Sequence, residues 1–233
     1  MGSLFQQIRS ECPMNPISFH LQMDDPRIAA LSEADARMGA LITLIGEIKA
    51  APQGPHFAAL ARSIISQQIS VKAAATIRGR VLGLAGELSP DALSAVNDEA
   101  LRGAGLSASK VAYLRDLSSK VQSGEVVLER LHEKSDDAVI QALTSIKGIG
   151  KWTAEMFLIF GLGREDVVSV GDAGLQRAAR WLYGLEERAD RKYLQQVMGL
   201  WSPYGSVASL YLWEAINIGH VDSGQTLDQL LSN

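Results

Sequence analysis

Asp172 is the carboxylate in this sequence whose neighbours best suit chemistry. It follows an apolar run, residues 167–170, and stands between Gly171 and Gly174. The apolar run is expected to hold Asp172 rigidly, and the glycines leave room for the backbone of a ligand. A helical pattern follows, and the N-terminus of a helix stabilises a negative charge. Taken alone, the pattern is also typical of a structural helix cap.

Earlier in the chain, residues 143–154 contain two glycines between two helical runs. Gly148 and Gly150 are separated by one residue, and the second helical run begins near Lys151. Glycine accepts positive φ and lets another backbone approach closely. The first amides of a helix lack intrahelical partners, and together with the helix dipole they favour a phosphate. The pattern indicates a helix-hairpin-helix clamp for the DNA backbone, with an ordinary tight turn as the alternative.

Composition limits the classes that this chain can belong to. It has 233 residues, of which 47% are hydrophobic and 6% aromatic. The single cysteine, Cys12, excludes an internal disulfide framework and a four-cysteine iron–sulfur cluster. No apolar run reaches the ~20 residues of a membrane span, and the N-terminus lacks the apolar segment of a signal peptide. We therefore expect a protein of the reducing cytoplasm, with no membrane partner.

The net charge of −4 and the pI of about 5.6 argue against a protein that coats nucleic acid nonspecifically. Basic residues nevertheless outnumber acidic ones in residues 101–120 and 144–164. A local basic face is therefore expected, with modest and strongly salt-dependent DNA binding.

Helical periodicity runs through most of the chain, and strand alternation is almost absent. Helical patterns cover residues 26–48, 56–70, 71–84, 108–121, 152–160, 189–201 and 204–218, with further starts near 89, 135, 174 and 226 and one short strand at 17–21. The sequence predicts an all-α fold with two helical lobes flanking a cleft. We expect a single domain, 1–233, with lobe one at about 56–165 and lobe two at about 1–55 plus 166–233.

Three other stretches accompany the hairpin and Asp172. They are Ala-Arg-Ser-Ile-Ile-Ser-Gln-Gln-Ile-Ser-Val at 61–71, Gly-Leu-Ser-x-x-Lys-x-x-Tyr-Leu at 105–114, and Trp-Ser-Pro-Tyr-Gly-Ser-x-Ala at 201–208 with Trp213 beyond. As a set they resemble the helix-hairpin-helix DNA glycosylases, in particular the alkylation-repair branch of 3-methyladenine DNA glycosylase II. The resemblance covers about residues 36–220 and implies the fold of that family without its N-terminal sheet domain.

The resemblance implies a monofunctional glycosylase that excises alkylated purines such as 3-methyladenine in base excision repair. The damaged nucleotide is flipped out of the duplex, and the side chain of Gln68 fills the gap in the stack. Asp172 stabilises the positive sugar as the N-glycosidic bond breaks. Bifunctional relatives carry a lysine where this chain has Trp152, which implies that lyase activity is absent.

The resemblance also assigns residues to the site. Aromatic faces attract an electron-poor alkylated base, so the pocket residues are Trp152, Trp213, Met156, Ala173 and Tyr204. The DNA-binding residues are Gln67, Gln68, Ser70, Lys147, Gly148, Ile149, Gly150, Lys151 and Thr153. The backbone carbonyls of Thr144, Ile146 and Ile149 match a family site for a monovalent cation, Na⁺ or K⁺, and no other cofactor is implied. Trp181 and Trp201 are expected in the core.

The chain departs from the family pattern at a few positions. Gly205 stands where many relatives have arginine. Ala173 and Met156 stand where some relatives have aromatic residues, which predicts a roomier pocket. The expected partner is double-stranded DNA containing damaged bases, bound by a monomer that is nucleoid-associated if bacterial. Two alternatives remain: a noncatalytic helix-hairpin-helix protein that binds distorted or abasic DNA, and a helical scaffold for a protein partner.

Overall fold

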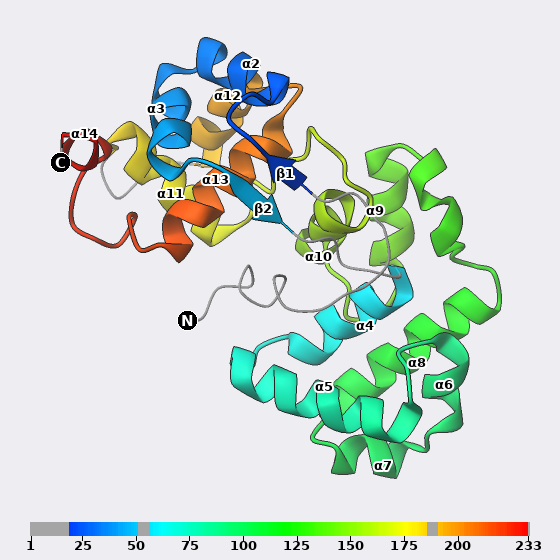
Figure 1. Cartoon of the computed structure of the whole chain (residues 1–233). Helices are drawn as coiled ribbons and strands as arrows, with labels where there is room; N and C mark the ends of the chain where they lie inside the picture. Colours follow the sequence, from blue (N-terminus) through cyan, green and yellow to red (C-terminus); the bar gives the residue numbers. More distant parts are fainter. Residues whose placement is uncertain (1–18, 51–55, 186–190, 233) are drawn as a thin grey trace. The chain divides into compact units, whose positions relative to one another are not determined.

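The computed structural model describes residues 19–50, 56–185 and 191–232, and the structural statements below concern these residues. The chain divides into two compact units (Figure 1). Unit one comprises residues 56–162, and unit two comprises 19–50 together with 163–185 and 191–232. Helices dominate both units, which confirms the predicted all-α class. No helix in the described parts of the chain is long and apolar enough to cross a bilayer.

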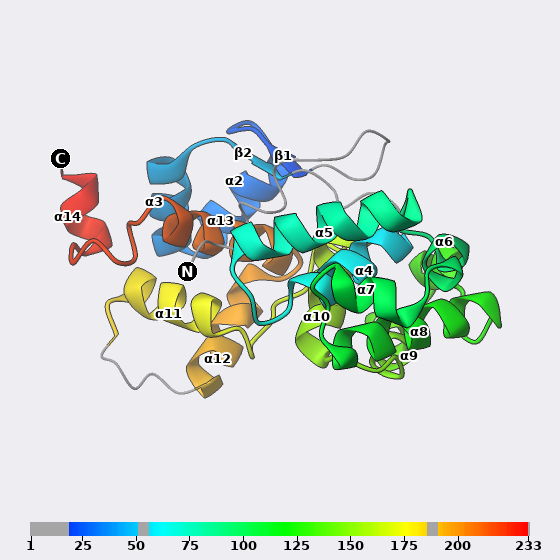
Figure 2. The same ribbon diagram turned by 90° about the horizontal axis from the view of Figure 1, so that it is seen from below.

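Unit one is built around the helix α4 (His56–Ser66), whose apolar side chains are buried. Helices α5 (Val71–Ala85) and α8 (Ala108–Gln122) pack against it (Figure 2). The remaining elements are α6 (Pro90–Ala95), α7 (Asp98–Gly103), η1 (Leu128–Glu133), α9 (Asp136–Thr144), α10 (Lys151–Met156) and η2 (Phe157–Gly161). The hairpin of residues 143–154 joins α9 to α10.

Polar residues start the helices of unit one where the sequence places them. Ser70, Ser89, Asn97, Ser107 and Ser135 are N-caps, and each side chain accepts a hydrogen bond from the amide three residues later. Each such cap satisfies one of the amides that a helix leaves without an internal partner. These local bonds fix where five helices begin before any tertiary contact is considered.

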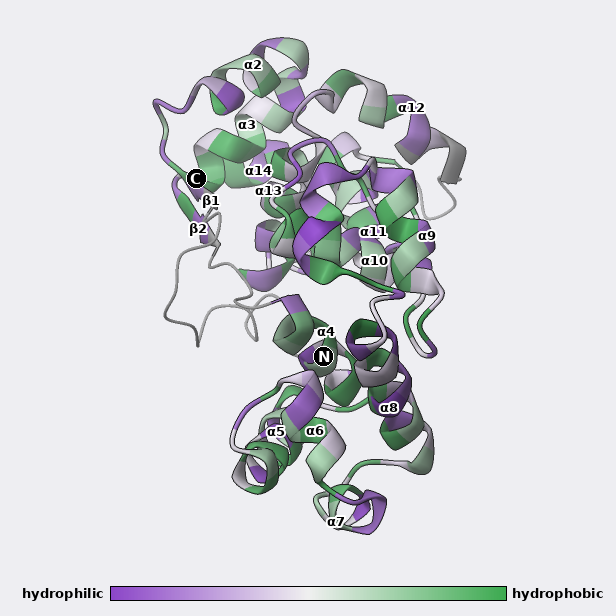
Figure 3. Ribbon diagram, turned by 90° about the vertical axis from the view of Figure 1, so that its right-hand side faces the viewer, coloured by the Kyte–Doolittle hydropathy of each residue, from purple (hydrophilic) through white to green (hydrophobic). Residues whose placement is uncertain are grey.

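Unit two is built around α13 (Gly205–Asn217), in which every residue from Gly205 to Ala215 is buried. Helices α2 (Pro26–Ala34), α3 (Ala36–Ile45), α11 (Ala173–Tyr183) and α12 (Arg191–Trp201) pack against α13. The short helix α14 (Leu227–Leu231) contacts α3. A helix that is apolar on all sides belongs in a core, whereas hydrophobic and hydrophilic residues alternate around many of the other helices (Figure 3).

Two short strands complete unit two. Strand β1 (Phe19–Leu21) pairs antiparallel with β2 (Ile48–Ala50), with Leu21 opposite Ile48. The predicted strand at 17–21 is confirmed for its last three residues, and residues 17 and 18 lie outside the described residues. The helical prediction for 26–48 was wrong at its end. Gly46 adopts φ 75° and ends α3, so that Ile48 joins the sheet.

Other boundaries also differ from the helical patterns. Helix α7 and the 3₁₀ turn η1 were not predicted, although Asn97 is a typical cap for α7. The predicted helix at 152–160 is a short α-helix followed by the π-helical turn η2, both deeply buried at residues 153–160. Residues 189 and 190 of the predicted helix 189–201 lie outside the described residues.

A buried carboxylate connects three elements of unit two. Oδ1 of Asp35 accepts hydrogen bonds from the amides of Arg37 and Met38 and so caps α3. Oδ2 accepts from the Tyr183 hydroxyl of α11 and from the Trp201 indole of α12, the latter at 3.1 Å. Burial, followed by the hydrogen bond to Asp35, raises the pKa of the Tyr183 phenol far above its usual value. Trp201 is fully buried, as predicted, whereas Trp181, also expected in the core, is only half-buried.

Replacing Asp35 should therefore destabilise unit two. We expect Asp35→Ala to lower the free energy of unfolding by about 2–4 kcal/mol, because it removes a cap and the acceptor that the Tyr183 hydroxyl and the Trp201 indole share. Thermal and urea unfolding followed by fluorescence measures the change. Replacement of the exposed Asp24 by alanine is the control and should change stability by less than about 0.5 kcal/mol. Equal unfolding curves for the two variants would contradict the importance of this network.

Candidate functional site

Asp172 is the N-cap of α11. Its Oδ1 accepts a hydrogen bond from the Leu175 amide at 2.6 Å and lies 3.4 Å from the indole nitrogen of Trp213. The carboxylate is thus held from two sides, by the start of α11 and by α13. Gly174 makes this geometry possible, because a Cβ there would lie 3.1 Å from Oδ1. The side chain of Asp172 is only partly buried, so a ligand can reach this end of the helix.

The apolar run before Asp172 is fastened to the start of α13. The Ser206 amide donates to the Glu165 carbonyl at 2.8 Å, and the Val167 amide donates to the Ser206 hydroxyl at 3.0 Å. Val167, Val168 and Ser169 are buried. Since α13 also carries Trp213, one helix positions both the loop that leads to Asp172 and the indole beside its carboxylate.

Gly205 has a structural explanation in this chain. Its amide donates to Oδ1 of Asp166 at 3.1 Å. A Cβ at Gly205 would lie 2.6 Å from Val168 and 3.0 Å from the same Asp166 oxygen. The loop of residues 165–170 therefore packs where a side chain would otherwise stand. An arginine at this position would not fit this packing.

The other predicted pocket residues of unit two lie near the two ends of this arrangement. Ala173 directly follows Asp172 and is exposed, whereas Trp213 is only 9% exposed. Tyr204 is half-buried and precedes α13, with its amide donating to the Trp201 carbonyl at 2.7 Å. Unit two therefore contains a carboxylate, an indole and a small residue together at the start of α11.

The two hairpin glycines of unit one serve different purposes. Gly148 has φ 80°, and a Cβ there would lie 2.2 Å from the ring of Tyr113 on α8. Gly150 has φ −90°, which any residue adopts, and a Cβ there would meet nothing within 4 Å. Of the two uses of glycine that the sequence suggested, positive φ therefore applies to Gly148 and not to Gly150. The fold requires glycine at position 148, whereas at 150 only an approaching ligand would require it.

The second hairpin helix begins without a side-chain cap. Gly150 is the N-cap of α10 and has no side chain that could accept a capping hydrogen bond. Thr153 in that turn is buried, whereas Lys147 and Lys151 on either side are exposed. The Lys147 ammonium lies 3.8 Å from Asp116 and that of Lys151 lies 3.7 Å from Glu155. Such loose pairs with exposed lysines contribute little to stability, so the lysines remain able to pair with phosphates.

The predicted wedge segment follows α4. Gln68, with φ 56°, is the one residue other than glycine with positive φ in the described part of the chain, and its side chain is exposed. Gln67 is half-buried, and its carboxamide nitrogen donates to the Gly148 carbonyl at 2.7 Å. Ser70 caps α5 through the Ala73 amide. Sequence reasoning placed Gln67 on the DNA and missed its bond to the hairpin.

Trp152 and Met156 belong to α10 and lie one helical turn apart. The Trp152 side chain is 37% exposed and that of Met156 is 6% exposed. A tryptophan that keeps this much exposure at the start of a helix is not a core residue, which agrees with its expected place beside the hairpin. Ile149, between the two hairpin glycines, is 4% exposed and anchors the turn in the core of unit one.

The carbonyl groups expected to hold a monovalent cation lie at the end of α9 and in the turn. Thr144 ends α9, where carbonyl groups lose their intrahelical donors. The Ile146 carbonyl accepts from the Ile149 amide at 3.1 Å and retains a second lone pair. The donor set fits a hard cation, and its occupation stays a prediction.

Most of the basic side chains expected on the surface at 101–120 bind partners within unit one. The Lys110 ammonium donates to the Ile65 carbonyl at 2.7 Å, and burial lowers the pKa of this lysine. Arg115 binds the carboxylate of Asp98 and two carbonyl groups near it. Lys120 pairs with Glu125. Counting charges along the sequence therefore overstates the basic surface, because helix-capping lysines and arginines are not available to DNA.

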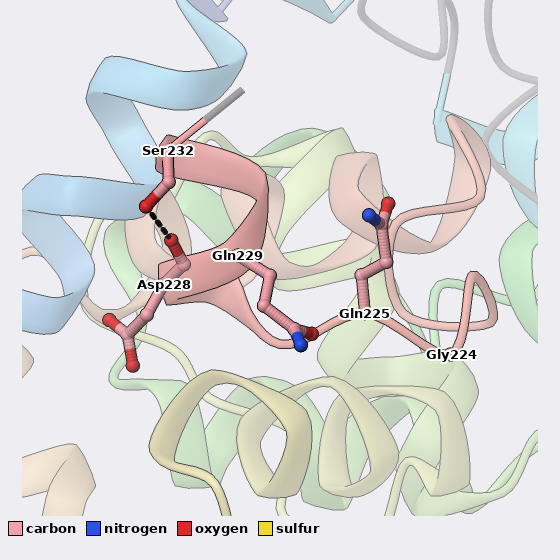
Figure 4. A pocket seen from close by; sticks show the side chains of 5 residues that line it. All are labelled: Gly224, Gln225, Asp228, Gln229 and Ser232. Carbon is pink, nitrogen blue, oxygen red and sulfur yellow. Dashed lines mark hydrogen bonds between the residues drawn. The ribbon is translucent and has the colours of Figure 1, made fainter.

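Unit two also has an open polar hollow near its C-terminus (Figure 4). It is lined by Gly224, Gln225, Asp228, Gln229 and Ser232. The Ser232 hydroxyl donates to the Asp228 carbonyl, and the Gln229 side chain accepts from the Thr226 amide in a capping box. The hollow includes none of the residues expected to act in chemistry.

Comparison with known proteins identifies the family. Residues 61–203 match the family described as HhH-GPD superfamily base excision DNA repair protein. The chain belongs to this superfamily. The match includes the end of α4, the hairpin and Asp172, and therefore most of the residues from which the resemblance was drawn. The resemblance is confirmed.

Individual members are also similar over most of their length. DNA-3-methyladenine glycosylase 1 of Schizosaccharomyces pombe is 30% identical over 191 residues, which are 79% of this chain and 84% of the relative. A crystal structure of a Bacillus halodurans DNA-3-methyladenine glycosidase has 43% identity and a TM-score of 0.82, covering 92% of this chain and 99% of that one. The S. pombe enzyme Mag1 in complex with abasic DNA has 29% identity and a TM-score of 0.72, covering 82% and 96%.

The two hairpin glycines should respond differently to alanine. Gly148→Ala should cost about 2–4 kcal/mol of stability, because it adds backbone strain and a clash with Tyr113. Gly150→Ala should leave stability within about 0.5 kcal/mol but weaken binding of duplex DNA about tenfold or more, by obstructing the backbone amides. Thermal unfolding and fluorescence anisotropy measure the two effects.

Gly103→Ala is the matched control, since Gly103 is exposed at the end of α7 and a Cβ there would meet nothing within 4 Å. It should leave DNA affinity unchanged. Unaltered DNA affinity in Gly150→Ala would show that the open side of Gly150 is not where DNA lies.

Proposed function

We propose that this chain is a monofunctional DNA glycosylase that excises alkylated purines such as 3-methyladenine by hydrolysing the N-glycosidic bond. Its superfamily acts in base excision DNA repair, and the relatives described above are named for 3-methyladenine. The observation that carries the proposal is the placement of Asp172, whose carboxylate is partly accessible yet held by the Leu175 amide and the Trp213 indole.

The carboxylate of Asp172 supplies the electrostatic part of the mechanism. When the N-glycosidic bond breaks, the base leaves with the bonding electrons and positive charge develops on the sugar. A carboxylate fixed in place stabilises that charge without having to reorganise during the reaction. The water that attacks the sugar then forms the new carbon–oxygen bond and loses a proton. An alkylated purine that is already cationic leaves as a neutral base, so one carboxylate suffices.

The indole of Trp213 has two roles in this proposal. Its N–H lies 3.4 Å from Asp172 Oδ1 and helps to orient the carboxylate. Its ring offers an aromatic face, which attracts an electron-poor base more strongly than a neutral one. Ala173 and Tyr204 are the other residues of unit two that we assign to the base pocket. Trp152 and Met156 of unit one stay predictions of the same kind.

The hairpin and the wedge bind the DNA. The amides of residues 148–153 grip phosphates, Lys147 and Lys151 add charge, and the exposed Gln68 fills the position of the flipped nucleotide. Phosphate contacts of this kind position a protein on the duplex and carry no base specificity. The proposed active form is a monomer, because the wedge, the hairpin and Asp172 are all present in one chain.

Asp172→Asn tests the chemistry without disturbing the fold. Asparagine keeps the oxygen that caps α11 but removes the negative charge, so base release should fall about 100-fold or more. Single-turnover release of 3-methyladenine from alkylated duplex DNA measures this, and affinity for abasic duplex should be retained. The exposed Asp222→Asn is the control. Near-normal release by Asp172→Asn would refute the assignment.

Reaction products should show hydrolysis alone. With Trp152 at the position of the lyase lysine, the enzyme should leave abasic sites that break only after heat or alkali treatment. Borohydride added during the reaction should trap no covalent enzyme–DNA complex. A trapped complex would show that another amine forms a Schiff base and that the lyase activity was wrongly excluded.

A noncatalytic protein that binds abasic or distorted DNA is the second candidate. Asp172 caps α11, a structural role that needs no catalysis, so DNA binding by the hairpin and the wedge does not require base release. It predicts tight binding of abasic duplex with no base released by the wild type, so the release assay distinguishes the two functions.

A further inference from the structure

The wedge segment and the hairpin of unit one are joined directly. The Gln67 carboxamide donates to the Gly148 carbonyl at 2.7 Å. Gln67 immediately precedes Gln68, and Gly148 is the glycine that the fold requires in the hairpin. A single hydrogen bond therefore connects the residue before the wedge to the turn of the clamp.

Three residues on one face of α8 contact the same two segments. Lys110, Tyr113 and Asp116 are spaced three residues apart, so they lie on one side of the helix. The Lys110 ammonium binds the Ile65 carbonyl at the end of α4 at 2.7 Å, and the Tyr113 ring fills the space that a side chain at Gly148 would take. Asp116 accepts from the Lys147 amide at 2.8 Å.

The backbone of Gln68 needs such support. The left-handed backbone conformation costs a residue other than glycine roughly 1–2 kcal/mol of conformational energy. Such strain persists only where surrounding contacts hold the residue in that conformation. Here α4 ends two residues earlier, and Ser70 begins α5 two residues later. The turn between the helices is too short to relax, and its N-terminal side is tied twice: Ile65 to Lys110 and Gln67 to Gly148.

We propose that Gln67 is a positioning residue that sets the distance between the wedge Gln68 and the hairpin, with Lys110 as its support on α8. This inference rests on the proposed function, because it assumes that Gln68 enters the duplex while the hairpin holds the phosphates. A wedge is useful only if it meets the gap at a fixed distance from that grip. The bond from Gln67 keeps the two in register within unit one. Gln67 itself then contacts the hairpin and not the DNA.

A double-mutant cycle tests this role. Gln67→Ala should weaken binding of an abasic duplex about five- to tenfold, the equivalent of one lost hydrogen bond, and leave the affinity for an intact duplex unchanged. In the Gln68→Ala background, the same replacement should have almost no further effect, because no wedge remains to be positioned. Anisotropy titrations of the four proteins with both duplexes provide the numbers.

A second readout separates positioning from general damage to the fold. The fluorescence of 2-aminopurine next to the abasic site rises when the stack is opened, and it should fall in Gln67→Ala at saturating protein. Lys110→Met keeps the apolar stem of the lysine and should reproduce the loss of discrimination in weaker form. Gln122→Ala is the matched control, since this glutamine of α8 binds Asp91 of α6. It should change neither readout.

Additive effects of Gln67→Ala and Gln68→Ala would overturn the proposal, because they would mean that Gln67 acts on DNA independently of the wedge. Equal losses for abasic and intact duplexes would overturn it as well, because they would indicate a distorted hairpin. These binding results do not depend on whether the protein releases a base. A wild-type protein that prefers abasic DNA but releases no alkylated base would refute the glycosylase function. The binding titrations would still test the role of Gln67.

Discussion

Every α-helix leaves its first backbone amides without internal partners, and the way this chain satisfies them organises both units. Side chains cap most of the α-helices whose starts the structure describes, through aspartate, serine, asparagine or threonine. Helix α13 lacks such a cap, but the Asp166 carboxylate and the Glu165 carbonyl accept its first two amides. Helix α10 of the hairpin also begins without a side-chain cap.

The same requirement explains the position of the candidate catalytic group. Asp172 is a helix cap, and the bond from the Leu175 amide orients it. Capping and catalysis do not compete, because a cap uses one oxygen and so fixes the direction of the carboxylate. The Trp213 indole then approaches the capping oxygen from α13. A residue that serves the fold in this way is held still, which is what stabilisation of a developing charge requires.

Unit one combines a tightly packed hairpin with a strained residue. The hairpin is packed tightly on the side of Gly148, where Tyr113 leaves no room, and it is open on the side of Gly150. Gln68, which we propose as the wedge, has a backbone conformation that glycine would adopt more easily. A strained residue that is exposed and surrounded by firm contacts is typical of a functional site. The strain is local, and burial of the apolar face of α4 provides stability that offsets its cost.

Much of this molecule could be predicted from the sequence, because caps and apolar periodicity act over a few residues. The starts of α5, α6, α8 and α9, the buried character of α13, and the family to which the chain belongs all follow from local patterns. Asp172 stood out because its glycines and the apolar run are adjacent to it in the chain. Prediction failed at Ile48, where Gly46 ends a helix and a distant strand supplies the partner.

Tertiary structure decided what local patterns leave open. In the sequence Gly148 and Gly150 look alike, and only the packing of Tyr113 from α8 distinguishes them. Gln67 looks like a second DNA contact, and only the fold brings its carboxamide to the Gly148 carbonyl. Lys110 and Arg115 count as surface charge until their carbonyl partners are known. The sequence determines which chemical groups the chain contains and where many of its helices begin. The fold decides which of those groups are already bound, since hydrogen bonds and close contacts depend on distances between segments far apart in the chain.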